Sequence, residues 1–282
     1  MKKLREKGMQ FIFLLTACVS IAAVILICVF LFINGVPAIT EIGVFKFLFG
    51  TQWKPANNLY GILPMIIGSI YVTAGALVIG VPIGIMTAVF MARFCPKWLY
   101  KIMKPAINLM SGIPSVVYGF FGLVVLVPFV RKVFGGRGMS VLTAAILLGL
   151  MILPTIISVS EASIRAVPQS YYEGGLALGA SHERSVFFAI LPAAKSGIFA
   201  GVVLGVGRAI GETMAVMMVA GNQAVIPKSL TSGVRTLTTN IVMEMGYSTD
   251  LHREALIGTA VVLFVFILII NISFSLIKRR EK

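Results

Sequence analysis

Residues 173–194 of the chain read EGGLALGASHERSVFFAILPAA, and this stretch decides how the rest of the sequence is interpreted. It lies within a polar segment, residues 161–195, that separates two long apolar runs. Three residues predict two short helices here: Pro168 suits a first helical turn, Gly179 a left-handed helix end, and Ser181 the N-cap of the next helix. Because the joint is rich in Ala and Gly, another protein can approach its backbone closely. We therefore interpret the segment as a docking element.

The composition places the chain in a membrane. It has 282 residues, of which 58% are hydrophobic and 12% are charged, and its mean hydropathy is +0.99. A soluble protein could not keep that much apolar surface out of water. The net charge of +14 would suggest a nucleic-acid partner for a soluble protein, but here the cations follow the membrane topology. We predict that the chain lies in a lipid bilayer and binds no nucleic acid.

Six apolar runs are each long enough to cross a membrane, for which roughly 20 residues suffice. We predict spans at about 11–33, 65–92, 108–130, 140–164, 197–220 and 255–277. The first run is longer than the ~7–15 apolar residues of a cleavable signal peptide, so it is predicted to remain as a span. Residues 61–92 exceed one upright helix, which indicates a short interfacial piece before the second span or a tilted helix. The predicted fold class is all-α: a polytopic membrane protein with six transmembrane helices in one domain, residues 1–282.

The basic residues orient these spans. With the N-terminus in the cytoplasm, fifteen of the 24 Lys and Arg residues fall in cytoplasmic segments, eight fall in outer segments, and Arg208 lies within a span. This excess agrees with the positive-inside rule. The sequence therefore predicts that both termini and the 161–195 segment face the cytoplasm.

No catalytic constellation or metal site is predicted. A phosphate-binding P-loop needs a Gly-Lys pair, and the sequence contains none. The two histidines, His182 and His252, are far apart in the sequence, and the three cysteines show no metal-ligand spacing. We therefore expect no enzyme activity and no cofactor on this chain. If ATP and its magnesium ion drive the protein, a partner must hydrolyse the ATP.

Two charged residues lie inside the predicted fifth span, in the sequence RAIGETMAV, residues 208–216. Arg208 and Glu212 are four residues apart, so on a continuous helix they share one face and can pair. An ionisable side chain at mid-bilayer costs at least ~2.5–3.5 kcal/mol, and such residues normally face a protein interior or a wet pathway. Two interpretations stay open. The pair is either a structural lock between two helices or part of a pathway in which Arg208 binds an anion.

The pathway interpretation carries a hypothesis about the substrate. The planar donor groups of Arg208 match an oxyanion. Near neutral pH, phosphate still carries a P–OH proton, because its second pKa is about 6. That proton can be donated to the carboxylate of Glu212, whereas sulfate has no such proton and would be repelled. The two residues are therefore predicted to favour phosphate over sulfate.

Small residues on the same span predict close helix packing. Gly197, Gly201 and Gly205 repeat every four residues and form a stripe that lets another helix approach.

The docking segment resembles the EAA loop of binding-protein-dependent ABC importer permeases. The resemblance rests on Glu173-Gly174-Gly175, on Gly179 six residues after the glutamate, and on Leu191-Pro192 a dozen residues further on. In that family the loop inserts into a cleft of a separate ATPase subunit, which implies an ATPase-coupling role for these six residues. The sequence departs from the family pattern with Gly-Gly in place of Ala-Ala and with Ala189 where Ile is usual. Pro192 also suits the first turn of the helix that re-enters the membrane.

Two further stretches, together with RAIGETMAV, resemble the phosphate-specific ABC transporter permeases: SGIPSVVYGFFGL, residues 111–123, and VRTLTTNI, residues 234–241. The likeness runs from the first span to the last. It implies the type I ABC importer permease (MetI-like) fold, a location in a prokaryotic cell membrane and import of inorganic phosphate. The partners that it implies are a second homologous permease subunit, a dimer of ATP-binding cassette ATPases and an extracytoplasmic phosphate-binding protein.

The stretch at residues 111–123 adds two candidate pathway residues. Gly112 and Pro114 would bend or break the helix there. Ser115 and Tyr118 offer hydroxyl groups to a pathway near Arg208. Plain helix packing at a proline bend accounts for the same residues equally well.

The predicted mechanism is alternating access, in which closure of the ATPase pair moves the docking segment and rigid helices relay that motion to the pathway. Two alternatives stay open. One is a permease for another oxyanion, such as sulfate, molybdate or phosphonate. The other is a secondary anion transporter that is coupled to an ion gradient and works without an ATPase.

Overall fold

The computed structural model describes residues 2–280, and the side chains of residues 6–276. Its α-helices are α1 (Lys2–Ile42), α2 (Val44–Phe49), α3 (Leu63–Val89), α4 (Lys97–Gly112), α5 (Ser115–Phe121), α6 (Val127–Phe134), α7 (Val141–Arg165), α8 (Gln169–Ala177), α9 (His182–Ser185), α10 (Leu191–Gly211), α11 (Met214–Val219), α12 (Leu237–Met245) and α13 (Asp250–Arg280). The π-helical turns η2 (Phe90–Phe94), η3 (Gly122–Leu126) and η4 (Val186–Ile190) continue α3, α5 and α9. A 3₁₀ turn, η1 (Pro55–Asn57), joins the two-residue strands β1 (Trp53–Lys54) and β2 (Leu59–Tyr60).

Six helical segments within the described residues are long and apolar enough to cross a membrane. They are Glu6–Ile42, Leu63–Phe94, Ser115–Phe134, Val141–Arg165, His182–Gly211 and Asp250–Leu276. The number of spans and the all-α class are therefore confirmed, and the β-structure in the described residues is limited to the small β1–β2 hairpin and one bridge between Gly221 and Val234. The fourth span matches its prediction closely, because Ser140 caps α7 by accepting a hydrogen bond from the backbone N–H of Thr143.

The predicted boundaries of the third span were wrong. Residues 108–130 do not form one helix, because α4 ends at Gly112 and α5 begins at Ser115. Pro114 has no backbone N–H to continue the ladder, and it restricts the residue before it, Ile113, to an extended conformation. The break itself agrees with the expectation for Gly112 and Pro114. α4 becomes a separate helix, and the span proper is α5–η3–α6.

The predicted fifth span was also wrong at both ends. One continuous helical segment runs from His182 to Gly211, and within it Pro192 lies in the first turn of α10, as predicted. The wide turn η4 directly precedes this proline. At its other end the helix stops at Gly211, and the shorter α11 follows after Glu212 and Thr213.

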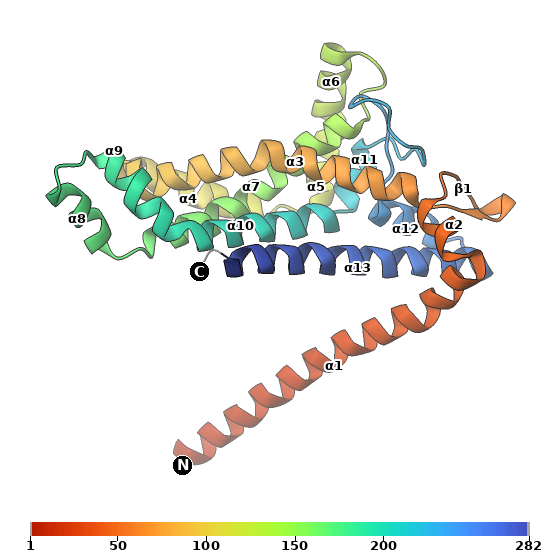
Figure 1. Ribbon diagram of the computed structural model, residues 1–282, viewed down its shortest axis with the longest axis horizontal. Helices are drawn as coiled ribbons and strands as arrows, with labels where there is room; N and C mark the ends of the chain where they lie inside the picture. Colours follow the sequence, from red (N-terminus) through yellow and green to blue (C-terminus); the bar gives the residue numbers. More distant parts are fainter. Residues whose placement is uncertain (1, 281–282) are drawn as a thin grey trace.

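The core of the bundle is α7, which packs against α3 and α10 along much of its length. Figure 1 shows α3, α7, α10 and α13 running along the long axis of the molecule. The predicted glycine stripe is confirmed as a contact surface, because a Cβ on Gly197, Gly201 or Gly205 would touch Ser163, Val159 or Ile156 of α7. The buried cluster around Leu147, Leu148 and Ile152 fills the space between these helices.

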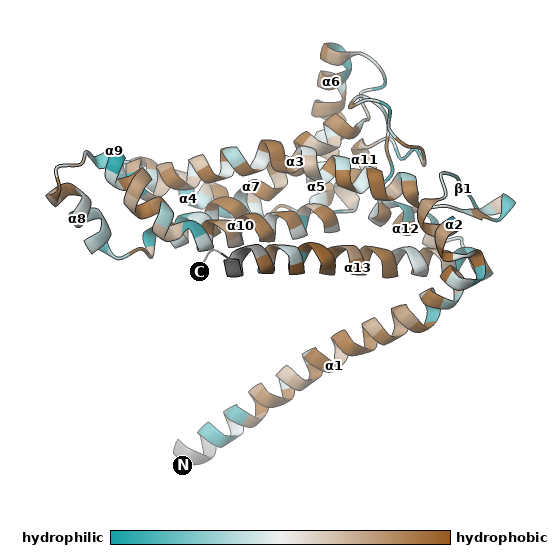
Figure 2. Cartoon of the chain, viewed as in Figure 1, coloured by the Kyte–Doolittle hydropathy of each residue, from teal (hydrophilic) through white to brown (hydrophobic). Residues whose placement is uncertain are grey.

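The two ends of the bundle carry the polar connections. At one end lie α8 and α9, which we call the α8–α9 end (Figure 1). At the other lie α2, the β1–β2 hairpin and the first turns of α13, which we call the hairpin end. Figure 2 shows hydrophobic residues along the helices and hydrophilic residues gathered mainly toward the two ends. This distribution is the one expected for a helix bundle that spans a bilayer.

The first helix leaves the bundle. α1 packs against α13 near its C-terminal end, where Phe32 and Phe264 form an edge-to-face pair with centroids 6.1 Å apart. Toward its N-terminus it diverges from the other helices (Figure 1). None of the residues in its most apolar window is buried against the rest of the described chain.

A substitution on α3 tests the tight α3–α7 packing. A Cβ on Gly80 would lie 2.8 Å from the Ile152 side chain and 3.0 Å from the carbonyl oxygen of Gly149. We expect Gly80→Val to lower the thermal midpoint of the purified protein, because overpacking a close-packed core costs about 1–3 kcal/mol. Gly246→Val is the control, since a Cβ there meets nothing within 4 Å. Equal midpoints for the two variants would contradict this view of the core.

Candidate functional site

Arg208 lies in the last turn of α10 and is half-buried. Its Nη1 donates a hydrogen bond to Oγ1 of Thr155 on α7 at 3.2 Å. A guanidinium carries five N–H donors, and the described residues supply one hydrogen bond to them. Arg208 therefore has donors left for an anion.

Glu212 follows the end of α10 in an extended conformation, with φ −70° and ψ 131°. Its Oε1 accepts a hydrogen bond from the backbone N–H of Ala215 at 3.1 Å, in the first turn of α11. Its backbone carbonyl accepts one from Oγ1 of Thr238 at 3.1 Å. The residue also borders a narrow cavity that is lined with hydroxyl groups from Ser69, Thr73 and Thr236.

The predicted pairing of Arg208 with Glu212 is not formed. The ion pairs among the described residues involve Glu161 and Glu244, and none joins Arg208 to Glu212. The reason is the helix end at Gly211, which removes the i, i+4 geometry on which the expectation rested. Each charge instead lies at the helix end that favours it, with the cation in the last turn of α10 and the anion just before α11.

The other two candidate pathway residues differ in their surroundings. Tyr118 is buried, and its hydroxyl donates to the carbonyl oxygen of Met110 at 2.9 Å, across the break between α4 and α5. That hydroxyl therefore helps to close the break. Ser115 is half-buried at the first position of α5. Among the described residues, the structure therefore joins neither Tyr118 nor Glu212 to Arg208 by a direct hydrogen bond.

The docking segment folds as predicted into two helices. Pro168 precedes α8, Gly179 has φ +82°, and Oγ of Ser181 accepts from the N–H of Arg184 at 3.2 Å to cap α9. The N–H of Gly179 donates to the carbonyl of Leu176, which ends α8 in a left-handed turn. At the tip Leu178 is 91% exposed, more than any other large hydrophobic side chain that the structure describes.

The six residues expected to contact an ATPase lie at or near this hairpin. Glu173, Gly174, Gly179 and Pro192 are exposed, whereas Gly175 and Leu191 are half-buried. Gly175 packs against Ser185 of α9, and a hydrogen bond of 2.8 Å between the hydroxyl of Tyr172 and Nδ1 of His182 holds α8 to α9.

Sequence reasoning missed a buried carboxylate near the α8–α9 end. Glu161 was placed at the start of the polar segment, but it lies in α7 and is 1% exposed. It accepts hydrogen bonds from the hydroxyl of Tyr100 at 2.7 Å, Nζ of Lys104 at 2.6 Å and Nε of Arg165 at 2.8 Å. The i, i+4 spacing to Arg165 could have indicated a pair. Nothing local indicates the partners on α4.

A second missed carboxylate lies at the hairpin end. Glu244 on α12 is 7% exposed. Its Oε1 accepts from Nη1 of Arg235 at 2.6 Å, and its Oε2 accepts from Nε1 of Trp53 at 2.8 Å and lies 2.9 Å from Nε2 of His252. We call these four residues the Glu244 cluster. Burial alone would raise the pKa of Glu244, but the hydrogen bonds from Trp53, His252 and Arg235 outweigh burial and hold that pKa below its ordinary value of 4.5.

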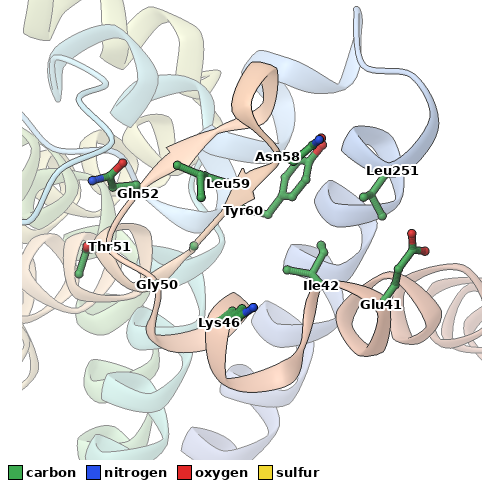
Figure 3. Close-up of a pocket in the computed structure, with 11 residues that line it drawn as sticks. Glu41, Ile42, Lys46, Gly50, Thr51, Gln52, Asn58, Leu59, Tyr60 and Leu251 are labelled. Atoms are coloured by element: carbon green, nitrogen blue, oxygen red, sulfur yellow. The ribbon is translucent and has the colours of Figure 1, made fainter.

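A pocket of about 710 Å³ opens beside this cluster. Figure 3 shows it between the end of α1, α2, the β1–β2 hairpin and the start of α13. Lys46, Gln52 and Asn58 provide polar groups, and Tyr60 and Leu251 provide apolar ones. The pocket is open, and it lies at the end of the bundle opposite to α8 and α9.

The chain is similar to known membrane transport proteins. The family model described as binding-protein-dependent transport system inner membrane component matches residues 80–282. The chain is 42% identical to the probable ABC transporter permease protein YqgH of Bacillus subtilis (strain 168), over 92% of this chain and 88% of that protein. It is 33% identical to the phosphate transport system permease protein PstC of Xylella fastidiosa (strain 9a5c), over 94% of this chain and 89% of that protein. The PstC of Pasteurella multocida (strain Pm70) is 32% identical, over 84% of this chain and 81% of that protein.

Solved structures of similar shape are also membrane transporters. A bacterial ABC transporter involved in the import of the acidic polysaccharide alginate has a TM-score of 0.61 at 13% identity and covers 93% of this chain and 95% of its own. The MetNI methionine ABC transporter in an inward facing conformation has a TM-score of 0.59 at 20% identity, with 82% of this chain and 100% of its own covered. At these identities the likeness establishes the fold alone.

The contact between Gly175 and Ser185 predicts opposite effects for two neighbouring substitutions. A Cβ on Gly175 would lie 2.7 Å from Oγ of Ser185, whereas a Cβ on Gly174 meets nothing within 4 Å. We expect Gly175→Ala to speed amide hydrogen exchange in residues 169–185. Gly174→Ala should slow it, because Ala favours a helix over Gly by up to about 1 kcal/mol. Adding Ser185→Ala to Gly175→Ala should restore slow exchange, and the same sign of change for both single variants would contradict the contact.

The lowered pKa of Glu244 predicts loss of stability in acid. A carboxyl whose pKa is depressed in the folded state contributes its full stabilisation above its unfolded pKa, near 4.5, and loses it as the pH falls through the lower folded-state pKa. We therefore expect the thermal midpoint of the purified protein to fall as the pH is lowered below about 4.5. Glu244→Gln should make this fall of the thermal midpoint in acid smaller. Glu254→Gln, which changes an exposed carboxylate on α13, should leave the fall unchanged. A fall of the same size in the Glu244→Gln variant would contradict the view that Glu244 causes the loss of stability in acid.

Proposed function

This chain belongs to the family of binding-protein-dependent transport system inner membrane components, and we propose that, as a permease subunit of an ABC importer, it forms part of the path by which inorganic phosphate crosses the membrane. ABC importer permeases work with an ATPase and a binding protein and are transport components rather than enzymes. The chain is accordingly a multi-pass membrane protein. The import of phosphate and the roles of individual residues are the parts that we propose.

The observation that carries the proposal is the environment of Arg208. A half-buried guanidinium on α10, with donors to spare, donates a hydrogen bond to Thr155 of α7. Such a group favours a tetrahedral oxyanion, because its N–H donors match adjacent oxygens. Glu212, one residue beyond the end of the same helix, supplies the acceptor for a P–OH proton. The phosphate transport permeases among the relatives support the same substrate.

The α8–α9 end is proposed to contact the ATPase on the cytoplasmic side. The exposed residues Glu173, Gly174 and Gly179 leave the backbone of the turn accessible, and the 91% exposed side chain of Leu178 offers an apolar anchor. Buried apolar anchors supply much of the affinity in protein interfaces. Leu191 and Pro192 continue this surface into α10, so a movement of the contact is passed directly to the helix that carries Arg208.

The remaining partners are assigned from surfaces that the chain leaves open. The apolar face of α1, which diverges from the bundle, supports contact with a second homologous permease subunit in the bilayer. The hairpin end then faces outward, toward the extracytoplasmic phosphate-binding protein. The membrane that we propose is a prokaryotic cell membrane, with both termini in the cytoplasm, and the distribution of basic residues supports this orientation. ATP and magnesium are proposed to bind to the ATPase and not to this chain.

Glu212→Gln tests the proposed function. The variant keeps an oxygen that can accept from the N–H of Ala215 but loses the negative charge. We expect phosphate uptake by cells that carry the complete transporter to fall about tenfold or more, because a hydrogen bond to a charged group is worth about 1.5–3 kcal/mol. Excess sulfate should compete with phosphate more strongly than in the parent.

The matched control is Glu254→Gln, which removes an exposed carboxylate of the same chain. It should transport phosphate at the parental rate. If Glu212→Gln took up phosphate and excluded sulfate as the parent does, the selectivity hypothesis would be wrong. Uptake of sulfate, molybdate or phosphonate in preference to phosphate by the parent would instead favour the alternative of another oxyanion.

A further inference from the structure

The Glu244 cluster is linked to the break at Glu212 by the segment that precedes α12. Arg235, which donates to Glu244, also donates from Nε to the carbonyl oxygen of Asn222 at 3.0 Å and from Nη1 to Oδ1 of Asn240 at 3.0 Å. It therefore ties the loop after α11 to the body of α12. The position of Arg235 is fixed by three separate acceptors.

The same segment holds the backbone of Glu212. Thr236 caps α12 and lies 3.0 Å, hydroxyl to hydroxyl, from Thr238. Thr238 then donates to the carbonyl oxygen of Glu212 at 3.1 Å. The backbone N–H of Leu237 donates to Oγ of Ser69 at 3.0 Å, which anchors the segment to α3. Arg235 directly precedes Thr236 in the chain, so it adjoins the segment whose Thr238 hydroxyl binds the carbonyl oxygen of Glu212.

On its other side the cluster reaches the surface of the hairpin end. Trp53 is 7% exposed and packs edge to face on Tyr60, with ring centroids 5.7 Å apart. Tyr60 lines the open pocket (Figure 3). His252, in the first turns of α13, contacts both aromatic rings and Glu244. Glu244 therefore joins the hairpin, α12 and α13 at one point.

We propose that Glu244 is a positioning residue for the transport pathway: through Arg235 and Thr238 it fixes the peptide that carries Glu212, and through Trp53 it makes the place of that peptide depend on the β1–β2 hairpin. This inference rests on the proposed function for the meaning of Glu212. Contact with the hairpin end is thereby coupled to the pathway by hydrogen bonds at Glu244 and Thr238 and by the backbone that joins Arg235 to Thr238.

The experiment measures the accessibility of the break directly. A reporter cysteine is introduced by Gly211→Cys in a background in which Cys18, Cys28 and Cys95 are replaced by alanine. Gly211 is exposed, and a Cβ there meets nothing within 4 Å, so the reporter fits the structure. A second reporter, Gly174→Cys, serves at the α8–α9 end, where a Cβ also meets nothing within 4 Å. The rate of labelling by a water-soluble maleimide is measured for each reporter in the full chain, purified in detergent without the ATPase, so that both reporters are exposed to the reagent.

Glu244→Gln and Trp53→Phe are each combined with the two reporters. We expect both variants to raise the labelling rate at residue 211 about fivefold or more. Glu244→Gln leaves a buried donor of the cluster without its acceptor, and Trp53→Phe removes the donor at Nε1 of the tryptophan. The labelling rate at residue 174 should stay at its parental value. Glu254→Gln and Trp98→Phe, which change an exposed glutamate and an exposed tryptophan, should alter neither rate.

The two reporters separate positioning from general loosening. An unchanged rate at residue 211, or an equal rise at residues 211 and 174, would overturn the proposal. Thr238→Val should raise the rate at residue 211 as well, and combining it with Glu244→Gln should add little, because both act along one path. The readout needs no substrate, so its failure is distinct from a failure of the chain to transport phosphate.

Discussion

The rest of the structure depends on the early end of α10 at Gly211, among the surrounding spans rather than at their tips. An interrupted helix leaves amide and carbonyl groups without partners, and in hydrocarbon each such group costs several kcal/mol. Here the partners come from nearby, since Glu212 accepts from the N–H of Ala215 and Thr238 donates to the carbonyl of Glu212. α12 lies beside the break and supplies that second partner. The interruption also separates Arg208 from Glu212, so that two opposite charges are held close in sequence without neutralising each other.

A single helical segment connects this break to the α8–α9 end. It runs from His182 to Gly211, 30 residues that correspond to about 45 Å at 1.5 Å per residue. Its glycines fit closely against α7, and the turn η4 leads into Pro192 without interrupting the helix. In the proposed mechanism this helical segment moves as a rigid body. Because it is packed along its length, a displacement at one end moves the other end rather than bending the helix. The docking surface and the candidate anion site are therefore parts of one mechanical unit.

Two buried carboxylates hold the ends of the bundle. Glu161 receives donors from α4 and from its own helix α7, and Glu244 receives them from the hairpin, from the segment before α12 and from α13. Removing one partner of such a group leaves an uncompensated buried charge, which is far more costly than losing an exposed pair. Each cluster thus fixes elements that are distant in the sequence. Glu161 and its three donors, Tyr100, Lys104 and Arg165, lie near the α8–α9 end. The Glu244 cluster lies near the pocket at the opposite end of the bundle.

The sequence by itself determined the membrane location, the six spans and the two helices of the docking segment, because these depend on local properties: apolar length, proline, glycine at positive φ and an N-cap serine. It also singled out Arg208 and Glu212, since charge within an apolar run is visible without a structure. Only the tertiary structure decided that α10 stops between these two residues and that Thr155 and Thr238 are their neighbours. It alone showed that Glu161 and Glu244 are buried at the centres of charge clusters. Those features arise from contacts between residues up to 191 positions apart, such as Trp53 with Glu244, and no local pattern encodes which distant donor will meet a given carboxylate.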